Sequence, residues 1–416
     1  MSRTVWKIAL VVAVALPSLG VRLAGVALSP AHAIVVFGAA VVAASFLLAW
    51  AAEVAQLDIS ASFATALLAL IAVLPEYAVD LYFAYTAGHR PAYAAYAAAN
   101  MTGSNRLLIG IGWPLVAILF AVGLRKRREP RRPVVLRPRR RLELGFLAVA
   151  GLYALLIPVK RSLSIVDAVV LLALFGGYLW RTSRQEQEEP ELHGTPAEIG
   201  QLAAPIRRTV VVAFFVGAAA LIALAAKPFA DGLVHGGRQL GVDEFLLVQW
   251  LAPLSSEAPE LIVAGILALR GNDESALGTL LSSKVNQWTL LVGSLPIAHA
   301  FGGGGLSLPL DARQNEEFLL TAAQALFALA LLLGLRLRAL EAVLLFVTFA
   351  AQFFFPQEGV RLVFAGVYGL LALVLLALRW KSIGPTFRAL LRNPEDAPSA
   401  PSPPRRELDY SRPPRA

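Results

Sequence analysis

The chain reads Leu74-Pro75-Glu76 and, one apolar segment later, Asn100-Met101-Thr102-Gly103-Ser104-Asn105; further on it reads Ala258-Pro259-Glu260 and then Gly278-Thr279-Leu280-Leu281-Ser282-Ser283-Lys284. Each pair of stretches places a carboxylate directly after a proline inside an apolar segment. The next apolar segment then carries small residues with hydroxyl or amide groups. Acidic residues inside apolar segments mark ion pathways in membrane proteins, and this pattern occurs twice.

The composition indicates a membrane protein. The 416 residues are 57% hydrophobic and 16% charged, and the mean hydropathy is +0.65. The apolar residues form runs of about 20, which is the length of a transmembrane helix. Barrel strands would instead show shorter alternating segments. We therefore expect an all-α integral membrane protein.

The apolar runs predict about twelve transmembrane helices. Residues 125–141 form the most basic loop, with ten arginines and lysines and the single acid Glu129. Basic loops stay in the cytoplasm, so this loop and both termini are expected there, in a plasma membrane of the prokaryotic type. The predicted spans are 8–28, 33–55, 61–87, 95–122, 143–159, 163–180, 208–228, 242–269, 274–299, 317–335, 338–355 and 360–379.

The two motifs predict an internal repeat of five helices. Pro259 and Glu260 follow Pro75 and Glu76 by 184 residues, and the later polar runs are 179 residues apart. The glutamates lie in the third and eighth spans, which cross the membrane in opposite directions. Inverted repeats of this kind are common in secondary transporters, where they surround one site near the middle of the membrane.

The repeat divides the chain into six parts. One helix at each end lies outside the five-plus-five core, and we interpret the first as a retained span, with a cleaved signal peptide as the alternative. The parts are an extra helix at 1–30, a first repeat at 31–181 with its motif at about 60–122, a cytoplasmic linker at 182–206, a second repeat at 207–356 with its motif at about 242–299, an extra helix at 357–380, and a basic, proline-rich tail at 381–416 that we expect to be disordered.

The carboxylates are candidate ligands for a hard cation. Glu76 and Glu260, with serine, threonine and asparagine oxygens nearby, suit Ca²⁺ or Na⁺. The sequence has no cysteine and its five histidines are scattered, so a zinc site is not expected. No phosphate-binding glycine motif occurs, and neither a nucleotide nor any other cofactor is expected. The expected partners are membrane lipid and inorganic cations, and nucleic acid is not among them, since the net charge of +9 resides in loops and tails.

The doubled motif resembles the two alpha-repeats of the sodium/calcium exchanger family, in the cation/calcium exchanger superfamily. The family's first repeat reads Gly-Thr-Ser-Leu-Pro-Glu and then Gly-Asn-x-x-Gly-Ser-Asn. The resemblance covers the ten-helix core, although only about 60 residues match the motifs closely. It implies a secondary antiporter, not an enzyme, that exchanges Na⁺ for Ca²⁺ by alternating access.

The resemblance also implies site residues. The two Pro-Glu glutamates would be the central ligands. The ion-binding set carried over comprises Glu76, Glu260, Asn100, Ser104, Asn105, Ser256, Glu257, Thr279 and Ser283. Asp80, one helical turn after Glu76, is a candidate for the ion pathway.

The chain departs from the family pattern at five positions. Ala72 and Val73 replace two hydroxyl residues of the first repeat. In the second repeat Glu257 replaces a serine, Thr279 an asparagine or aspartate, and Lys284 an asparagine. Lys284 could be a tethered cation that pairs with Glu257 and replaces one bound Na⁺. The alternative is a compensating salt bridge outside the pathway.

Three functions therefore remain open. The first is Ca²⁺ exchange against Na⁺ or H⁺. The second is Na⁺/H⁺ or other monovalent cation exchange, which the missing hydroxyls and Lys284 favour. The third is a receptor or scaffold that keeps the fold without transport. An intramembrane hydrolase with paired carboxylates would not explain the inverted repeat.

Overall fold

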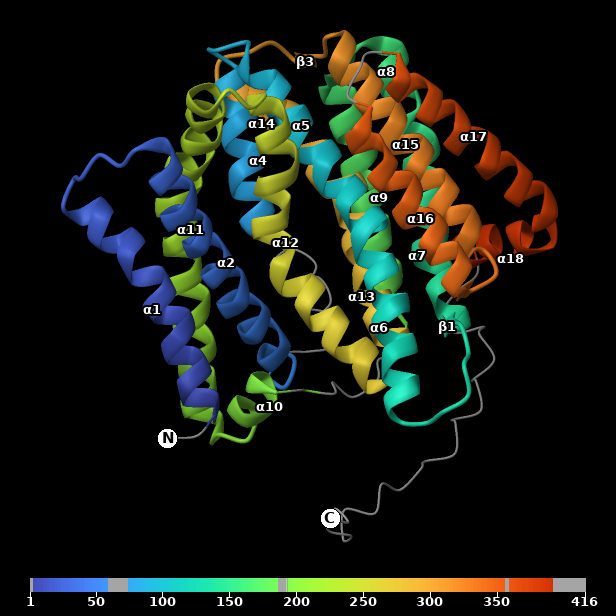
Figure 1. Ribbon diagram of the computed structural model, residues 1–416, viewed down its shortest axis with the longest axis horizontal. Coiled ribbons are helices and arrows are strands. Elements are labelled where there is room, and N and C mark those ends of the chain that lie inside the picture. Colours follow the sequence, from blue (N-terminus) through green and yellow to red (C-terminus); the bar gives the residue numbers. More distant parts are fainter. Residues whose placement is uncertain (1–2, 59–73, 186–191, 193, 356–358, 392–416) are drawn as a thin grey trace, which may run out of the picture.

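Figure 1 shows a bundle of long helices in the computed structural model, which describes residues 3–58, 74–185, 192, 194–355 and 359–391. The elements are α1 (Arg3–Leu23), α2 (Pro30–Ala55), α4 (Leu74–Ala87), α5 (Tyr93–Leu107), the π-helix η1 (Leu108–Gly112), α6 (Trp113–Lys126), β1 (Val134–Val135), the 3-10 helix η2 (Pro138–Arg140), α7 (Arg141–Ala154), α8 (Leu156–Lys160), β2 (Ser162–Ser164), α9 (Ile165–Thr182), α10 (Thr195–Gly200), α11 (Ala204–Leu240), α12 (Glu244–Arg270), α13 (Asp273–Asn286), the π-helix η3 (Gln287–Leu291), α14 (Val292–Phe301), β3 (Ser307–Pro309), α15 (Ala312–Leu332), β4 (Arg336–Leu337), α16 (Ala339–Ala351), the 3-10 helix η4 (Gln352–Phe354), α17 (Val360–Leu378) and α18 (Trp380–Leu391).

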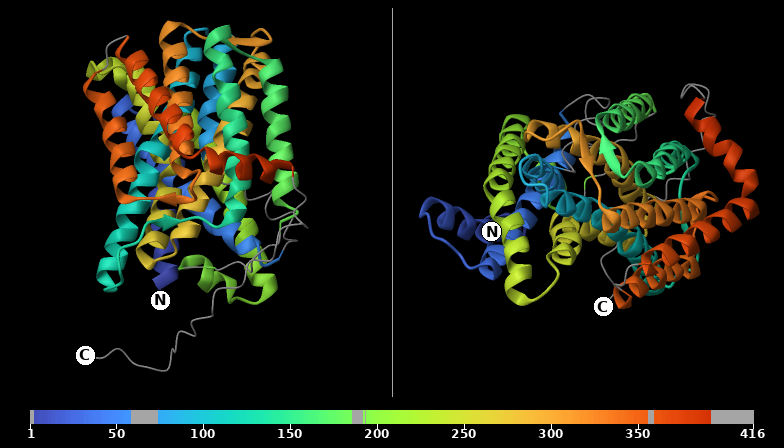
Figure 2. Two further views of the ribbon diagram at one scale, coloured as in Figure 1. Left: turned by 90° about the vertical axis from the view of Figure 1, so that its right-hand side faces the viewer. Right: turned by 90° about the horizontal axis from the view of Figure 1, so that it is seen from above.

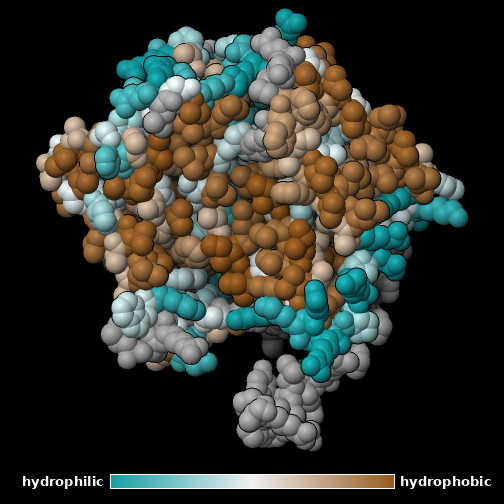
Figure 3. Space-filling view, in the orientation of Figure 1, coloured by the Kyte–Doolittle hydropathy of each residue, from teal (hydrophilic) through white to brown (hydrophobic). Residues whose placement is uncertain are grey.

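The helices confirm an integral membrane protein. Among the described residues, nine helices are long and apolar enough to cross a bilayer. Apolar side chains cover the middle of the face in Figure 3, and hydrophilic ones gather toward its upper and lower edges. Five predicted spans differ from a single long helix. The span 95–122 contains α5, η1 and α6, 143–159 contains α7 and most of α8, 274–299 contains α13, η3 and α14, 338–355 contains the 13-residue α16, and 61–87 is described only from Leu74.

The two halves run in opposite directions, as an inverted repeat requires. One end of the bundle, here called the basic end, carries the loop between α6 and α7; the other is the opposite end. α4 ends beside the end of α14, where His89 contacts the carbonyl oxygen of Gly302 at the opposite end. α12 ends at the basic end, where Arg127 donates to the carbonyl oxygen of Leu269. The two glutamate-bearing helices are therefore antiparallel.

A π-helix repeats at the same place in each half. η1 begins at Leu108 and η3 at Gln287, 179 residues later, directly after the two polar runs. A π turn is rare and occurs most often at functional sites, because it rotates the residues that follow it relative to those before it. The equal spacing confirms the repeat that the sequence predicts.

Short strands join the two halves at both ends of the bundle. At the basic end Val134 and Val135 pair with Leu337 and Arg336 in an antiparallel ribbon. At the opposite end β2 pairs with β3 in the same way. Each ribbon connects one half of the chain to the other, so the two halves are joined at both ends of the bundle.

Ion pairs add a second connection at the basic end. Arg132 binds both carboxylate oxygens of Asp273, at 2.9 and 3.2 Å. Arg140 binds Glu274 at 2.9 Å and Glu143 at 2.8 Å. The arginine-rich loop thus holds the beginning of α13 and the beginning of α7 together.

The helices α1, α2 and α11 form the side of the bundle at the left of Figure 1, and Figure 2 shows α1 at its outer edge. α11 packs along α2, and Asp58 after α2 binds Arg207 near the start of α11 at 2.8 Å. Only 17% of the most apolar 18-residue stretch of α1 is buried inside the protein, compared with 78% for α15. α1 is therefore peripheral, as expected for a helix outside the repeats.

Part of the predicted tail is helical. Residues 381–391, expected to be disordered, belong to α18, whose Thr386 is buried and accepts a hydrogen bond from Arg141 at 3.1 Å. Arg181 donates to the carbonyl oxygen of Ala389 at 3.0 Å. The sequence reasoning missed that α18 is amphipathic and that α7 and α9 supply its partners. Residues 392–416 lie outside the described part of the chain.

Removing the Asp58 carboxylate should destabilise the pairing of α2 with α11. Hydrogen bonds from Arg207 lower the pKa of Asp58 from 3.8 to about 2. Because the pKa is lower in the folded state, the ionised Asp58 contributes fully to the free energy of unfolding above the unfolded pKa of about 3.9. This contribution is lost as the pH falls toward 2. Asp58→Asn should lower the thermal unfolding temperature at pH 7, and by less at pH 3.

Glu129→Gln is the matched control, because Glu129 forms an exposed pair with Arg127 at the same end of the bundle. Exposed pairs contribute little to stability, so this variant should unfold near the wild-type temperature. If Asp58→Asn lowers the unfolding temperature as much at pH 3 as at pH 7, the stabilising role of the ionised Asp58 is contradicted.

Candidate functional site

The candidate site lies where α4, α5, α12 and η3 meet. Gly103 permits this approach: a methyl group at its position would lie 1.7 Å from the carbonyl oxygen of Gln249 on α12. Pro259 in α12 has no N–H group, which leaves a backbone carbonyl without its helical partner. The site therefore forms where a glycine lets two helices approach closely and a proline interrupts the hydrogen bonds of one of them.

Ser104 is the centre of the site. Its hydroxyl contacts Oε1 of Glu76 and, at 2.5 Å, Oε1 of Glu257. The amide nitrogen of Gln287 donates to Ser104 Oγ and to Glu257 Oε1, both at 2.7 Å, and lies 3.5 Å from Glu76 Oε2. Glu76 and Glu257 are 4% and 3% exposed and Ser104 is fully buried. Two carboxyl groups from different halves thus share one hydroxyl.

This arrangement requires a proton or a cation. A serine hydroxyl has one hydrogen, so it cannot donate to both glutamates at once. One of the two carboxyl groups must donate instead, which requires that it is protonated, or a cation must replace the missing hydrogen. Two unneutralised carboxylates inside a membrane bundle would cost several kcal/mol. The site is therefore built to hold at least one positive charge.

Several oxygen atoms around this centre are buried without a hydrogen-bond partner among the described residues. They are both carboxylate oxygens of Asp80, the Oδ1 of Asn100, the Oε2 of Glu257 and the Oε1 of Gln287. Asp80 is fully buried one turn after Glu76 on α4. Buried acceptors are normally paired, so these atoms are available for a cation, a proton or water.

Glu260 lies near this centre but has a different partner. Its Oε2 accepts a hydrogen bond from Ser283 at 2.8 Å, and its side chain is only partly buried. The resemblance to the exchanger family implies Glu76 and Glu260 as the two central ligands. In the structure the Ser104 hydroxyl joins Glu76 to Glu257, because the rotation of α12 turns Glu257 toward α5.

Lys284 binds Asn105 and not Glu257. Its ammonium group is fully buried and lies 2.5 Å from the carbonyl oxygen and 2.7 Å from Oδ1 of Asn105. It also lies over the ring of Trp288, 5.6 Å from the centroid. The expected ion pair between Glu257 and Lys284 is therefore not a direct contact, and the side-chain nitrogen of Lys284 binds Asn105 instead.

Two predicted ligands lie apart from the shared hydroxyl. Thr279 is exposed and donates to the carbonyl oxygen of Ser275 in its own helix. Ser256 is buried but donates to the carbonyl oxygens of Ala252 and Pro253. Both hydroxyls satisfy their own helix, which short polar side chains readily do. The substituted positions Ala72 and Val73 lie outside the described residues.

Gln287 is the site residue that the sequence analysis missed. It lies three residues after Lys284, hence on nearly the same side of the helix, and it is the first residue of η3. Its spacing from Lys284 was the feature of the sequence that could have indicated Gln287 as a site residue. No group of three or more histidine, aspartate or glutamate side chains that could hold a metal occurs in the described ranges. A cation here would depend on amide and hydroxyl oxygens as well as carboxylates.

Comparison with known proteins gives one family and one fold. The family model for the sodium/calcium exchanger protein matches residues 29–183 and 210–356. A solved structure of the H⁺/Ca²⁺ exchanger CAX is 44% identical, with a TM-score of 0.89, and the match covers 94% of this chain and 98% of that one. A comparison with curated proteins found no match.

Two more distant structures share the fold. Native YfkE is 15% identical with a TM-score of 0.61, covering 87% of this chain and 99% of that one. The sodium-calcium exchanger NCX_Mj, soaked with 10 mM Na⁺ and zero Ca²⁺, is 18% identical with a TM-score of 0.53, covering 79% of this chain and 99% of that one. At these identities the likeness concerns the fold alone.

Gln287→Leu should destabilise the protein. The change keeps a side chain of similar size but removes the amide that donates to Ser104 and Glu257, and a hydrogen bond to a charged group contributes about 1.5–3 kcal/mol. We expect a lower thermal unfolding temperature in detergent. The control Thr279→Val removes an exposed hydroxyl and should change the stability by less than about 0.5 kcal/mol. Equal unfolding temperatures for the two variants would contradict the central position of Gln287.

Proposed function

Because the chain belongs to the sodium/calcium exchanger protein family, we propose that it is a secondary active antiporter that exchanges Ca²⁺ against H⁺ by alternating access. The observation that carries the choice of H⁺ over Na⁺ is the Ser104 hydroxyl shared by Glu76 and Glu257. Its contacts are satisfied when one proton resides on the carboxyl pair. The 44% identity to an H⁺/Ca²⁺ exchanger supports the same choice.

Competition for the carboxylates would couple the two ions. Ca²⁺ takes six to eight oxygen ligands and prefers ionised carboxylates. Its entry between Glu76 and Glu257 would require the shared proton to leave, and the Ser104 hydroxyl would then present an oxygen lone pair to the ion. A returning proton would neutralise one carboxylate and weaken Ca²⁺ binding. The two substrates would thus exclude each other, which is the requirement for antiport.

The inverted repeat supplies the means for alternating access. α4 and α12 cross the bundle in opposite directions. Each is followed in its half by a helix with a polar run and then by a π-helix. When one half adopts the conformation of the other, the site opens toward the other end. Glu76 and Glu257 come from different halves, so they would face both sides in turn.

The arginine-rich loop suggests the orientation. The loop between α6 and α7 lies at the basic end together with the beginning of α1 and the linker helix α10 (Figure 1). We place this end, and both termini, in the cytoplasm of a plasma membrane, because short basic loops are retained on that side. Membrane lipid and inorganic cations are then the only partners that the proposal needs.

Lys284 favours a second candidate, the exchange of a monovalent cation for H⁺. When Glu76 and Glu257 are both ionised they carry two negative charges, and a protonated Lys284, which is fully buried, would offset one of them. A net charge of minus one matches Na⁺ better than Ca²⁺. Flux distinguishes the candidates, because only the first moves Ca²⁺.

The protein reconstituted in liposomes should move ⁴⁵Ca²⁺ in response to a pH gradient. Glu76→Gln and Glu257→Gln remove one ionisable ligand each and should abolish the exchange, and Ser104→Ala should slow it at least about tenfold through loss of hydrogen bonds to charged groups. Thr279→Ala, which lies outside the cluster, should exchange at the wild-type rate.

Three results would change the assignment. A pH gradient that moves Na⁺ but not ⁴⁵Ca²⁺ would support the monovalent exchanger. Movement of ⁴⁵Ca²⁺ that follows a Na⁺ gradient and ignores pH would replace H⁺ with Na⁺. No flux of either ion, in the wild type as in Glu76→Gln, would support a receptor or scaffold without transport.

Lys284→Asn should increase the number of positive charges carried in each cycle. If the ammonium replaces a bound cation, the variant must bind an additional ion to neutralise the same carboxylates. The reversal potential of the reconstituted exchanger should then shift relative to the wild type at equal ion gradients. An unchanged reversal potential and ion selectivity would remove the tethered-cation hypothesis and leave a structural hydrogen bond to Asn105.

A further inference from the structure

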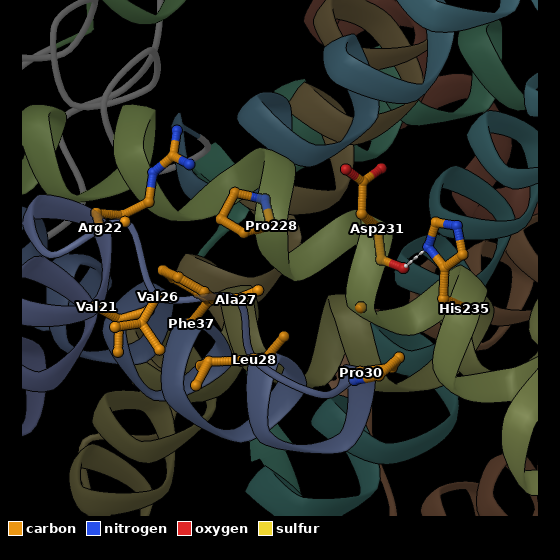
Figure 4. A pocket seen from close by; sticks show the side chains of 13 residues that line it. Val21, Arg22, Val26, Ala27, Leu28, Pro30, Phe37, Pro228, Asp231 and His235 are labelled. Carbon is orange, nitrogen blue, oxygen red and sulfur yellow. Dashed lines mark hydrogen bonds between the residues drawn. The ribbon is translucent and has the colours of Figure 1, made fainter.

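A cavity of about 420 Å³ lies away from the carboxylate site, between the turn that follows α1 and the outer part of α11 (Figure 4). α1 crosses the bundle and ends at Leu23, and α2 begins again at Pro30. The cavity therefore lies at the opposite end of the bundle, at the depth where a transmembrane helix leaves the apolar layer. This is the depth of the phospholipid headgroups.

The cavity is apolar on one side and charged on the other. Val21, Val26 and Leu28 line the side formed by α1 and the turn after it. Arg22 projects from the end of α1, and Asp231 projects from the facing helix α11; Figure 4 shows both polar ends on the same side, away from the apolar side chains. The cavity is thus amphipathic, with the guanidinium of Arg22 on the α1 side and the ion pair of Asp231 with Lys227 on the α11 side.

Arg22 is available to an external anion. Its side chain is exposed, and no acidic residue of the described ranges forms an ion pair with it. Arginine binds phosphate through two parallel N–H groups, which makes it the usual ligand for a phosphodiester. The guanidinium can therefore hold one phosphate at the rim of the cavity.

Asp231 retains capacity to accept hydrogen bonds. Tyr82 donates to its Oδ1 at 2.7 Å and Lys227 to its Oδ2 at 2.6 Å. A carboxylate has about four acceptor positions, so about two remain. His235 lies one turn away, and its Nδ1 is 2.7 Å from the carbonyl oxygen of Asp231. If Nδ1 carries the hydrogen, the Nε2 atom is a further acceptor.

We propose that this cavity binds a phospholipid with a primary ammonium group, phosphatidylethanolamine. Arg22 would bind the phosphate, Asp231 and His235 would accept hydrogen bonds from the ammonium, and the glycerol end of an acyl chain would lie along Val21, Val26 and Leu28. Phosphatidylglycerol has no ammonium group. The quaternary ammonium of phosphatidylcholine has no N–H donor, so the acceptors on α11 distinguish the three headgroups.

The bound lipid would join α1 to α11. α1 is sparsely packed, with 17% of its most apolar stretch buried. A lipid whose phosphate is held by α1 and whose ammonium is held by α11 would connect the two helices across the cavity. Binding to the folded state alone raises stability, so phosphatidylethanolamine should also raise the unfolding temperature of the purified protein.

Native mass spectrometry of the full chain, titrated with each lipid bearing the same acyl chains, tests the proposal. The wild type should bind phosphatidylethanolamine more tightly than phosphatidylglycerol or phosphatidylcholine. Arg22→Gln should weaken this binding about tenfold, which corresponds to ~1.4 kcal/mol. Asp231→Asn should remove the preference over phosphatidylcholine. Arg90→Gln changes another exposed arginine at the same end and should have no effect.

A fourth variant tests the cavity without altering a charge. Ala27 is exposed in the turn and lines the cavity, so Ala27→Trp should fill it and exclude the lipid. Because Arg22 and Ala27 are both exposed, these two variants should fold even if Asp231→Asn does not. Equal affinity of the wild type for the three lipids would overturn the proposal. Wild-type binding by Arg22→Gln and Ala27→Trp would overturn it as well.

Discussion

A single serine hydroxyl between two buried carboxyl groups is the interaction on which the rest of this structure depends. Ser104 contacts Glu76 from one helix and Glu257 from another, and Gln287 donates to the same group. An apolar bundle tolerates such a cluster only when its charge is neutralised. The need for a neutralising proton or cation connects the fold to ion exchange.

The close approach of α5 and α12 makes this cluster possible. A glycine at position 103 lets the backbone of Gln249 approach, and this brings Glu257 within reach of the next residue, Ser104. The π-helix η3 then turns Gln287 toward the same hydroxyl. Ribbons at both ends of the bundle fix the ends of the helices. Small local features, rather than the length or number of the helices, thus place the polar atoms.

The two halves have the same plan but different chemistry. Asn105 and Lys284 occupy equivalent positions, 179 residues apart, and they bind each other directly. Equivalent positions of an inverted repeat meet near its pseudo-symmetry axis. A lysine there supplies hydrogen-bond donors to the axis, whereas an asparagine would supply both a donor and an acceptor. The two ends of the bundle also differ in chemistry, because at the basic end Arg132 and Arg140 form ion pairs with the start of α13.

The sequence by itself determined the membrane class, the antiparallel five-helix repeats and the candidate acids, because hydropathy and the spacing of motifs are properties of the chain alone. It named both Glu257 and Glu260, which lie three residues apart on nearly the same face of α12, but not which of them contacts Ser104. It also overlooked Gln287 and included Thr279, which is exposed. Only the tertiary structure decided these points, because a contact between helices depends on their rotation and distance. Those are set by packing at positions such as Gly103, remote in sequence from the partners they bring together.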